Sequence, residues 1–470
     1  MASLVWFRRD LRVHDNTALS RAAKSSDHVI GLFVIAPGQW KQHDDADAKI
    51  YFWLQNLKCL SEALSKLNIP LLIRVRDSFD DTPELVAKVA QEHQCDKLFF
   101  NREYEVYERR RDRKTEQLMA DMEIDVESFH DRIIVPPKEI ATKDGRFYSV
   151  FTPYRRVWDT RALEFSKVLP KPKTLEQSNV EPDEVPDSVK GFDASKARHD
   201  LWPAGEAEAK KRLKKFAARI DDYNDARDIP ATCGTSLISP WLNVGVVSPR
   251  QCLAVALKHN GGSLSGSEGS VTWVSELTWR DFYTHVMVGF PQVSRHQPFK
   301  PKTNGIQWRQ HKEDYQAWCE GRTGYPIVDA GMRQLSQTGW MHNRLRMVTA
   351  MFLTKNLLID WRWGEKWFMQ NLVDGDLAAN NGGWQWSAST GTDSVPYFRI
   401  FNPFSQSKRF DPQGTFIKKF CPELKSVPAT ALHDVKKLAA AIEQLGVEYP
   451  DYVVDYKAGR ERALAAFKSL

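Results

Sequence analysis

The chain has 470 residues, of which 42% are hydrophobic and 27% charged, and 66 Lys and Arg against 60 Asp and Glu give a formal net charge of +6. This length exceeds one comfortable hydrophobic core, so we expect two domains. No apolar run approaches the roughly 20 residues of a membrane span, and the opening MASLVWFRRD indicates a strand, not a signal peptide. We therefore expect a cytoplasmic protein, and its mildly basic charge permits a phosphate-bearing partner without requiring one.

The cysteine and tryptophan contents are also informative. The six cysteines are widely spaced and form no CxxC pair, which is typical of reduced thiols and argues against a zinc or redox site. Of the 16 tryptophans, only Trp6, Trp40, Trp53 and Trp158 precede residue 200. The C-terminal part is therefore expected to be a different kind of structure from the N-terminal part.

Residues 1–130 alternate strand-like and helical patterns. Apolar β-rich runs lie at 4–7, 29–35, 70–75 and 97–101, with helical spacing between them at 46–67 and 83–94. This rhythm predicts an α/β domain with a doubly wound parallel sheet. The turn after the first strand, RRDLRVHDN, has no GxGxxG motif, so the sequence does not support a dinucleotide at the usual position of this fold.

Residues 131–201 are expected to form an interdomain linker, because the stretch from about 165 to 200 is dense in Pro, Asp, Ser and Lys and has little periodicity. The Gly/Ser segment 261–270 lacks the Lys-Ser/Thr ending of a phosphate loop and is interpreted as a flexible connection. Residues 202–470 are expected to form a larger all-α domain, with helical patterns at 205–222, 248–258, 271–288, 326–338, 340–359 and 363–372.

The segment 374–393, DGDLAANNGGWQWSASTGTD, suits neither an amphipathic helix nor a half-buried strand on packing grounds. Its paired glycines would let a planar ligand approach the backbone, its Asp and Asn supply polar edges, and its tryptophans supply flat polarisable surface. Two interpretations stay open for this segment taken alone: a ligand site, or an irregular Trp-rich loop over a core.

Two helical faces carry acids, bases and aromatics where a core stripe would carry Leu, Ile and Val. Together they suggest two walls of one polar, aromatic-lined cavity, whereas either face alone is explained better by charges that face water. The residues, at offsets i, i+3, i+4 and i+7, are Glu276, Trp279, Arg280 and Tyr283 on one helix and Trp340, Asn343, Arg344 and Met347 on the next.

A third candidate is the segment CGTSLISPW at 233–241, in which hydroxyl side chains follow a glycine and a Ser-Pro pair can start a helix. Such a segment can hold a phosphate through its hydroxyls and free backbone N–H groups. Many helix starts have the same composition without binding anything, so the motif has moderate specificity.

Seven motifs along nearly the whole chain resemble those of the cryptochrome/photolyase family. They are WFRRDLRVHDN (6–16), GTSLISP (234–240), ELTWRDFY (276–283), GYPIVDAGMRQL (324–335), GWMHNRLRM (339–347), IDWRWGEKWF (359–368) and the segment 374–393. Within the family the chain is similar to class I cyclobutane pyrimidine dimer photolyases of bacterial type. The resemblance implies an N-terminal α/β domain for an antenna pigment and a helical domain that holds FAD beside a DNA-facing cavity.

The resemblance also implies FAD contacts. Hydroxyls and amides would hold the pyrophosphate, Arg346 could pair with Asp374, and an amide from Asn380 at flavin N5 would suit a lasting anionic reduced flavin. The implied repair step is electron transfer from photoexcited reduced FAD to the dimer, ring splitting and return of the electron. The matching positions are Tyr223, Thr235, Ser236, Leu237, Ile238, Ser239, Glu276, Arg280, Asn343, Arg346, Asp374, Gly375, Asp376 and Asn380.

For DNA, the resemblance implies that the damaged dinucleotide flips into a pocket and packs against Trp279 and Trp386. Family members that act on (6-4) lesions are expected to carry a histidine at position 347, so Met347 favours the cyclobutane dimer. Glu276, Asn380 and Met347 are the expected catalytic residues. The positions implied to face DNA or the lesion are Arg227, Glu276, Trp279, Tyr283, Asn343, Arg344, Met347, Trp386 and Gln406.

Trp308, Trp361 and Trp384 match the chain through which oxidised flavin regains electrons from the surface. Indoles are oxidisable and polarisable, which suits them to this relay. Without the resemblance, any one of the three would be interpreted as a core residue.

The antenna match is looser. His43 and Glu108 agree with positions that hold 5,10-methenyltetrahydrofolate in similar bacterial enzymes, but Tyr107 stands where Asn is expected and Arg295 where Lys is expected. Folate is the expected antenna, with deazaflavin or an empty site as alternatives.

Two other functions are weighed against light-driven repair of DNA. One is a signalling cryptochrome with the same fold and FAD but no repair, which usually carries a tail or a different residue in place of Asn380. The other is a light-independent nucleic-acid-binding protein, which would carry no coloured chromophore. We expect a monomer without a metal, associated with the bacterial nucleoid when bound to DNA.

Overall fold

The computed structural model describes residues 2–470, and the chain folds into two compact units. Unit 1 consists of Met1–Ile220, Ser236–Ser294 and Val373–Ala378, and unit 2 consists of Asp221–Thr235, Arg295–Leu372 and Ala379–Leu470. The predicted boundaries at 130 and 201 remain a prediction about domains, because each unit combines separate stretches of the chain.

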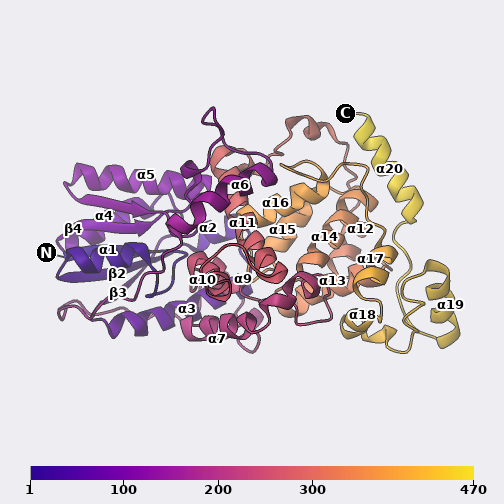
Figure 1. The fold of residues 1–470 in the computed structure, drawn as a ribbon, viewed down its shortest axis with the longest axis horizontal. Helices are drawn as coiled ribbons and strands as arrows, with labels where there is room; N and C mark the ends of the chain where they lie inside the picture. Colours follow the sequence, from indigo (N-terminus) through magenta and orange to yellow (C-terminus); the bar gives the residue numbers. More distant parts are fainter. Residues whose placement is uncertain (1) are drawn as a thin grey trace. The chain divides into compact units, whose positions relative to one another are not determined.

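Unit 1 contains a five-stranded parallel sheet of order β3-β2-β1-β4-β5. Val5 in the central strand pairs with Gly31 on one side and Phe99 on the other. This confirms the predicted doubly wound α/β fold (Figure 1). The strands are β1 (Ala2–Phe7), β2 (His28–Ile35), β3 (Leu71–Val75), β4 (Cys95–Asn101) and β5 (Asp125–Phe129).

The sequence missed β5, because its residues DVESF alternate charge with apolar side chains and none is fully buried at this edge of the sheet. It also missed α5, for a different reason. The buried residues of α5 are Glu108, Arg111, Asp112, Thr115 and Met119, so its inner face is mostly polar and no apolar periodicity marks it.

Helices connect the successive strands of unit 1, as the parallel pairing of those strands requires. Two of them, α4 and α5, pack against each other, as Figure 1 shows above the strands. The helices are α1 (Thr17–Ser25), α2 (Pro37–Gln42), α3 (Asp47–Ser65), α4 (Thr82–Glu92) and α5 (Val106–Asp121).

The rest of unit 1 forms helices joined by irregular segments. The predicted linker contains the helix α6, of which Phe151, Tyr154 and Trp158 are buried, and its role as a linker stays a prediction. The prediction of a flexible connection at 261–270 was wrong in part, because that segment ends inside α11, which Ser267 caps. The helices are α6 (Phe151–Arg161), α7 (Glu206–Ala217), α9 (Ser239–Asn243), α10 (Pro249–His259) and α11 (Glu268–Gly289), with 3-10 turns at Pro137–Glu139, Ala162–Phe165, Ala194–Lys196, Ile220–Asp222 and Val293–Arg295.

Unit 2 is helical around an aromatic core that includes Trp318, Phe352, Trp361, Phe368 and Trp384. Among residues 2–470 every strand lies in unit 1, as expected. The helices are α8 (Tyr223–Ala226), α12 (Lys312–Cys319), α13 (Pro326–Thr338), α14 (Asn343–Met351), a π-helix (Phe352–Asn356), α15 (Trp361–Met369), α16 (Leu377–Ala388, in this unit from Ala379), α17 (Pro403–Phe410), α18 (Thr415–Phe420), α19 (Val435–Leu445) and α20 (Tyr456–Lys468), with 3-10 turns at Pro301–Gly305 and Pro422–Leu424.

Two helix predictions in this region were wrong in part. Trp340 does not belong to the helical face assigned to it, because the helix begins at Asn343 after His342, whose side chain accepts a hydrogen bond from the backbone N–H of Arg344. The segment 374–393 was not predicted to form an amphipathic helix, but its residues Leu377–Ala388 form α16. The prediction failed because this helix has no clear apolar stripe.

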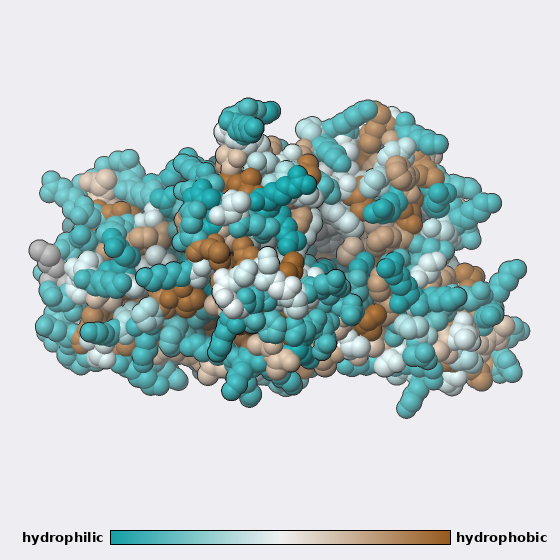
Figure 2. All heavy atoms as spheres, in the orientation of Figure 1, coloured by the Kyte–Doolittle hydropathy of each residue, from teal (hydrophilic) through white to brown (hydrophobic). Residues whose placement is uncertain are grey.

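The described cysteines are all free, as expected for reduced thiols. Within residues 2–470 no helix combines the length and the apolar character that a membrane crossing needs. The face drawn in Figure 2 is largely hydrophilic, with hydrophobic patches that are separate from one another.

Candidate functional site

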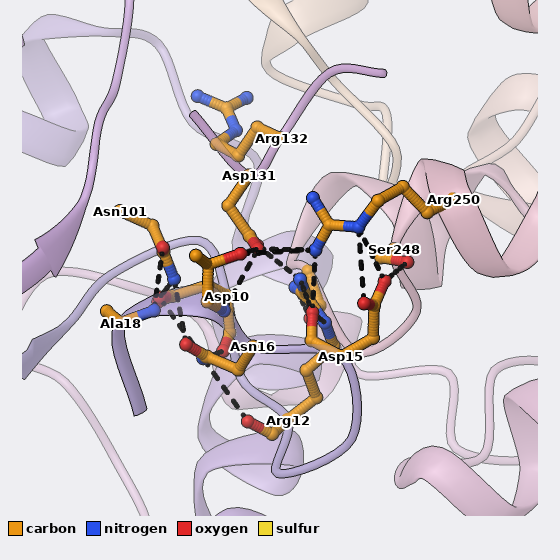
Figure 3. A network of polar contacts seen from close by, with 12 residues as sticks. Asp10, Arg12, Asp15, Asn16, Ala18, Asn101, Asp131, Arg132, Ser248 and Arg250 are labelled. Atoms are coloured by element: carbon orange, nitrogen blue, oxygen red, sulfur yellow. Dashed lines mark hydrogen bonds and ion pairs between the residues drawn. The ribbon is translucent and has the colours of Figure 1, made fainter. Parts of the chain in front are cut away.

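A buried network of charges fixes the loop that follows β1 (Figure 3). The Arg250 guanidinium on α10 lies 3.0 Å from a carboxylate oxygen of Asp15 and 2.7 Å from one of Asp131. Arg12 forms a second ion pair with Asp131. Burial alone would raise the pKa of Asp131, but Arg12 and Arg250 hold it well below its usual range. The loop is therefore rigidly tied to α10.

A second charged cluster lies at the carboxyl ends of β1 and β4. Arg9, two residues after β1, lies 2.9 Å from Glu105, and Arg111 lies 2.9 Å from Glu103. Arg132 lies 3.6 Å from Glu103 and 3.5 Å from Glu105. Figure 3 shows its side chain directed away from the first network. Burial opposes ionisation of Glu103 and Glu105, but the arginines lower both pKa values to about 2, so both carboxylates are charged.

The segment Val373–Ala378 belongs to unit 1, and it contains Asp374, Gly375 and Asp376. The Ser239 hydroxyl donates a 2.6 Å hydrogen bond to Asp374, which joins two stretches that the sequence assigned to FAD. The Asp376 carboxylate lies 2.6 Å from Arg9 and 3.2 Å from Arg132. Residues far apart in the chain therefore meet here.

The phosphate-cradle candidate has an unusual backbone. Leu237 has a left-handed φ of 53°, and Ser239–Asn243 forms a short helix with Pro240 in its first turn. At Gly234 a Cβ would lie 2.1 Å from the Ala226 carbonyl oxygen, so only glycine fits. Ser236 is buried and Ile238 is nearly inaccessible. The local conformation suits a loop that presents hydroxyls and backbone groups to a ligand.

The predicted face of α11 includes a stacked aromatic pair that the sequence did not suggest. The Trp279 ring lies parallel to that of Phe151, with centroids 3.6 Å apart and an interplanar angle of 5°. Tyr283 follows at 5.6 Å from Trp279. Arg280 donates a hydrogen bond to the Arg132 carbonyl oxygen. One face of the Trp279 indole is thus occupied by Phe151, which fixes the orientation of the ring.

In unit 2, Arg344 on α14 is held by two neighbours. It lies 2.6 Å from Asp228 and its guanidinium lies 4.3 Å from the Phe410 ring centroid. Arg227 packs over the ring of Tyr223 at 5.5 Å. No motif in the sequence indicated a role for Asp228, which directly follows Arg227 and becomes a candidate only because the fold brings it to Arg344.

The side-chain amide of Asn380 donates a 2.9 Å hydrogen bond to the Glu365 carbonyl oxygen. Asn381 donates to the carboxylate of the same Glu365 at 2.8 Å, and Glu365 also lies 2.9 Å from His296. Glu365 is buried, and no role was predicted for it from the sequence. It fixes the orientation of the Asn380 amide through its backbone.

The three tryptophans of the expected electron chain all belong to unit 2. Trp361 and Trp384 are buried members of its core, and the half-buried Trp308 packs against that core. The Trp384 ring lies 5.9 Å from Trp318 and 4.9 Å from Phe368, edge to face. Its indole N–H has no hydrogen-bond partner among the described residues.

The antenna candidates His43 and Glu108 lie together in unit 1, with 3.6 Å between His43 Nδ1 and Glu108 Oε1, and the centroid of the Tyr107 ring lies 5.8 Å from that of His43. Burial, with Glu105 and Glu103 nearby, raises the pKa of Glu108 well above its usual range. One Glu108 oxygen is buried without a hydrogen-bond partner in the described structure. This oxygen leaves Glu108 able to form a hydrogen bond with a polar ligand. Arg295 belongs to unit 2.

The structure groups the predicted residues by unit. The proposed single cavity stays a prediction, since α11 and α14 belong to different units, as do Asp374 and Arg346. Unit 1 holds His43, Glu108, Ser236, Leu237, Ile238, Ser239, Glu276, Trp279, Arg280, Tyr283, Asp374, Gly375 and Asp376, and unit 2 holds Tyr223, Arg227, Thr235, Trp308, Asn343, Arg344, Arg346, Met347, Trp361, Asn380, Trp384, Trp386 and Gln406.

Several features fit a flavin nucleotide. The buried Trp384 indole N–H lacks a hydrogen-bond partner in the described structure. At Gly383 on α16, a Cβ would meet no atom within 4 Å, so the helix has open space beside it. In contrast, residues 2–470 contain no group of His, Cys, Asp and Glu arranged to hold a metal ion.

Two family profiles match the chain. The profile described as DNA photolyase matches residues 3–174, and that described as the FAD binding domain of DNA photolyase matches residues 273–469. The deoxyribodipyrimidine photo-lyase of Vibrio cholerae is 44% identical over 471 residues, which cover 99% of each chain. That of Escherichia coli is also 44% identical, over 99% of this chain and 98% of the relative.

Solved structures agree with these similarities. A bacterial class III photolyase from Agrobacterium tumefaciens is 34% identical with a TM-score of 0.88, covering 100% of this chain and 97% of that one. An archaeal photolyase from Sulfolobus tokodaii with two FAD molecules is 31% identical with a TM-score of 0.80, covering 100% of both. A Synechocystis cryptochrome is 27% identical with a TM-score of 0.88, covering 99% of both.

Proposed function

Since the chain belongs to the DNA photolyase family, we propose that it repairs cyclobutane pyrimidine dimers in DNA in a reaction driven by blue light. The observation that carries this proposal is the similarity over the full length to enzymes named deoxyribodipyrimidine photo-lyase. A signalling cryptochrome without repair is less favoured, because the cryptochrome structure is 27% identical whereas those curated relatives are 44% identical.

The cofactor is FAD, since residues 273–469 match the photolyase FAD-binding domain. When bound in its reduced anionic form, FAD supplies the electron that opens the dimer after light absorption. In unit 1 the residues proposed to hold it are centred on Ser236–Ser239 and Asp374–Asp376, and Ser239 and Asp374 support each other by a 2.6 Å hydrogen bond. In unit 2 they include Tyr223, Thr235, Asn343, Arg346 and Asn380.

Asn380 is proposed to control the protonation of the flavin. Its amide is oriented by donation to the Glu365 carbonyl oxygen. An amide does not ionise and is a poor proton donor. An aspartic acid at this position could deliver a proton, whereas Asn380 would leave a reduced flavin anionic.

Lesion binding is proposed to combine stacking with charge. Trp279 and Trp386 would pack against the flipped-out bases, with Glu276 and Met347 contacting the dimer. Arg227 and Arg344, with Tyr283, Asn343 and Gln406, would contact the DNA. Because phosphate contacts release counterions, affinity should fall as salt rises. This substrate implies that the enzyme works in the cytoplasm beside the nucleoid.

The Trp279 assignment can be checked by binding. Trp279→Ala should weaken the affinity for dimer-containing DNA about 10- to 100-fold, because stacking of one base contributes roughly 1–3 kcal/mol. Trp367→Ala removes a half-buried tryptophan of α15 without a proposed role and serves as the control. Equal affinities in the two variants would contradict the assignment.

We propose that electrons return to oxidised FAD through Trp308, Trp361 and Trp384.

We propose that the antenna is 5,10-methenyltetrahydrofolate, bound at His43 and Glu108. The buried oxygen of Glu108 that has no hydrogen-bond partner in the described structure supports a polar ligand there. A folate absorbance band in protein purified under mild conditions would support folate, and a different band would identify another antenna.

The deciding experiment compares blue light with darkness. The reduced protein is mixed with DNA that contains one thymine dimer, and the remaining dimer is quantified by chromatography. We expect loss of dimers only in the light. No light-dependent loss by protein that contains reduced FAD would refute the proposed function.

A further inference from the structure

Six residues from the C-terminal half of the chain, Val373–Ala378, belong to unit 1, although the stretches before and after them, Arg295–Leu372 and Ala379–Leu470, belong to unit 2. The six include Asp374, Gly375 and Asp376, which are proposed to contact FAD. Contacts with the N-terminal part of the chain must therefore set the position of this segment.

The Gly375 carbonyl oxygen accepts two hydrogen bonds in unit 1. Lys49 on α3 donates one at 2.7 Å, and the Asn243 side chain donates the other at 3.0 Å. Lys49 is 2% exposed and Gly375 is also buried, so the ammonium group has little competition from water. Two donors satisfy both lone pairs of this carbonyl oxygen and fix the direction of the peptide group.

The Asp376 carboxylate is held by two arginines from the N-terminal part of the chain, Arg9 at 2.6 Å and Arg132 at 3.2 Å. Arg9 bridges Asp376 to Glu105, which lies 2.9 Å away, and also donates to the Asn243 side-chain oxygen at 3.3 Å. Asn243 therefore links the two anchors, since its amide contacts both Arg9 and Gly375.

Arg9 is the cation that balances the buried negative charges of Glu105 and Asp376. Burial would raise the pKa of Asp376, but Arg9, Arg132 and Arg280 lower it, so the carboxylate is ionised. Without Arg9, the ionised Glu103, Glu105 and Asp376 would share fewer cations in a buried site. Their repulsion would displace Asp376, because this residue lies on a short segment that the same contacts hold in place.

We propose that Arg9 and Lys49 are positioning residues for FAD, which hold Asp374–Asp376 in the conformation that the flavin requires without contacting it themselves. The inference rests on the proposed function, because it takes these three residues as FAD contacts. It assigns to the N-terminal α/β region a role in FAD affinity that is separate from an antenna.

The test is a titration of full-length apoprotein with FAD, followed by flavin fluorescence and by the fine structure of the flavin absorbance band. Arg9→Gln should weaken FAD binding about 10- to 100-fold, as expected for loss of a hydrogen bond to a charged group. Arg9→Lys should recover part of this affinity. Lys49→Met should weaken binding about tenfold, and it carries the test if Arg9→Gln does not fold.

A double-mutant cycle separates positioning from general damage. If Arg9 acts through Asp376, then Arg9→Gln should change the FAD affinity less than about threefold in an Asp376→Asn background. Arg21→Gln, which removes an exposed ion pair with Glu127 in the same unit, should leave FAD affinity unchanged. A loss that is equal in both backgrounds would overturn the inference.

The aspartate variants separate the positioning role from the assignment of the FAD contacts. If Asp374→Asn and Asp376→Asn weaken FAD binding while Arg9→Gln and Lys49→Met do not, the positioning role is refuted and the proposed function stands. If neither aspartate variant affects FAD binding, the assignment of this segment to FAD is wrong, and the inference is wrong with it.

Discussion

The loop after β1 in unit 1 and the core of unit 2 bury charged groups in opposite ways. In the loop network Arg12, Asp15, Asp131 and Arg250 each have a partner of the opposite sign. In unit 2, Lys355 of the π-helix is 0% exposed, and in the described part of the chain it meets a hydroxyl and an aromatic ring: Ser389 Oγ at 2.8 Å and the Phe467 centroid at 3.7 Å.

This difference in pairing changes the pKa values of the buried side chains Asp131 and Lys355. Arg12 and Arg250 keep Asp131 charged against its burial. Burial, with Lys300 nearby, lowers the pKa of Lys355 to about 7. Paired charges therefore stay ionised and specify one geometry, whereas a buried cation without a carboxylate partner approaches neutrality and lowers stability. The comparison predicts that removal of a charge lowers the free energy of unfolding in the loop network and raises it at Lys355.

The largest effect is expected from Asp131→Asn. The change leaves Arg12 and Arg250 buried beside a neutral group, and it should lower the free energy of unfolding by about 3–5 kcal/mol. Urea unfolding measures this loss. Asp125→Asn provides the control, because its side chain is exposed and lies 4.0 Å from Lys97, so a change within about 0.5 kcal/mol is expected. Similar losses in both would break the comparison.

Lys355→Met should raise the free energy of unfolding, in contrast to Asp131→Asn. At pH 6 we expect a gain of about 2–4 kcal/mol, since a pKa lowered from 10.5 to about 7 costs roughly 1.4 kcal/mol per pKa unit, partly offset by the contacts with Ser389 and Phe467. Wild-type stability rises between pH 7 and about 10.5, where the unfolded chain holds the extra proton, so the gain should shrink over that window.

Unfolding of wild type and Lys355→Met at several pH values measures this second effect. Lys437→Met on α19 is the matched control, because Lys437 is exposed and should give no pH-dependent difference. A Lys355→Met variant that is less stable than wild type at pH 6 would show that the lysine is stabilising as a cation.

A smaller loss is expected from Gly364→Ala in the aromatic core. A Cβ there would lie 2.1 Å from the Trp384 ring and 2.7 Å from Leu353, so overpacking should cost about 1–3 kcal/mol. Gly383→Ala is the control, because its Cβ would meet no atom within 4 Å. Thermal unfolding of the two apoproteins should differ accordingly, and equal melting temperatures would contradict tight packing around Trp384.

The smallest effect on stability is expected from Trp308→Phe, within about 1 kcal/mol, because Trp308 is half-buried at the edge of the core. Its functional effect should be large: photoreduction of oxidised FAD should fall at least tenfold, while protein with already reduced FAD should still repair dimers. Trp363→Phe, also packed against this core, is the control. Equal photoreduction in wild type and Trp308→Phe would refute the electron chain.

Local pattern was sufficient for the elements whose inner face is apolar. The predicted run at 29–35 is β2, and the pattern at 326–338 coincides with α13. It failed for α5, whose buried face carries Glu108, Arg111 and Asp112, because charged residues give no apolar periodicity and one of their partners, Arg8, which pairs with Asp112, lies far away in the sequence. It failed for α16 because no apolar stripe marks that helix.

The residues of the candidate site also fall into those that the sequence predicted and those that it did not. Its residue types and their family resemblance were present in the sequence, including Asn380 and the three tryptophans. Phe151 and Asp228 lie outside every motif named from the sequence, and Glu365 lies within the motif at 359–368 but had no predicted role. Each becomes meaningful only through its neighbour: Trp279, Asn380 and Arg344 respectively.

The sequence by itself determined the α/β order of the first part, the helical character of the second, the family and the chemistry available to its side chains. These follow from short-range periodicity and from motifs that are continuous in the chain. Only the tertiary structure decided that Arg9, Lys49 and Arg132 hold Asp374–Asp376. Burial and pairing depend on contacts between residues hundreds of positions apart, which no local pattern contains.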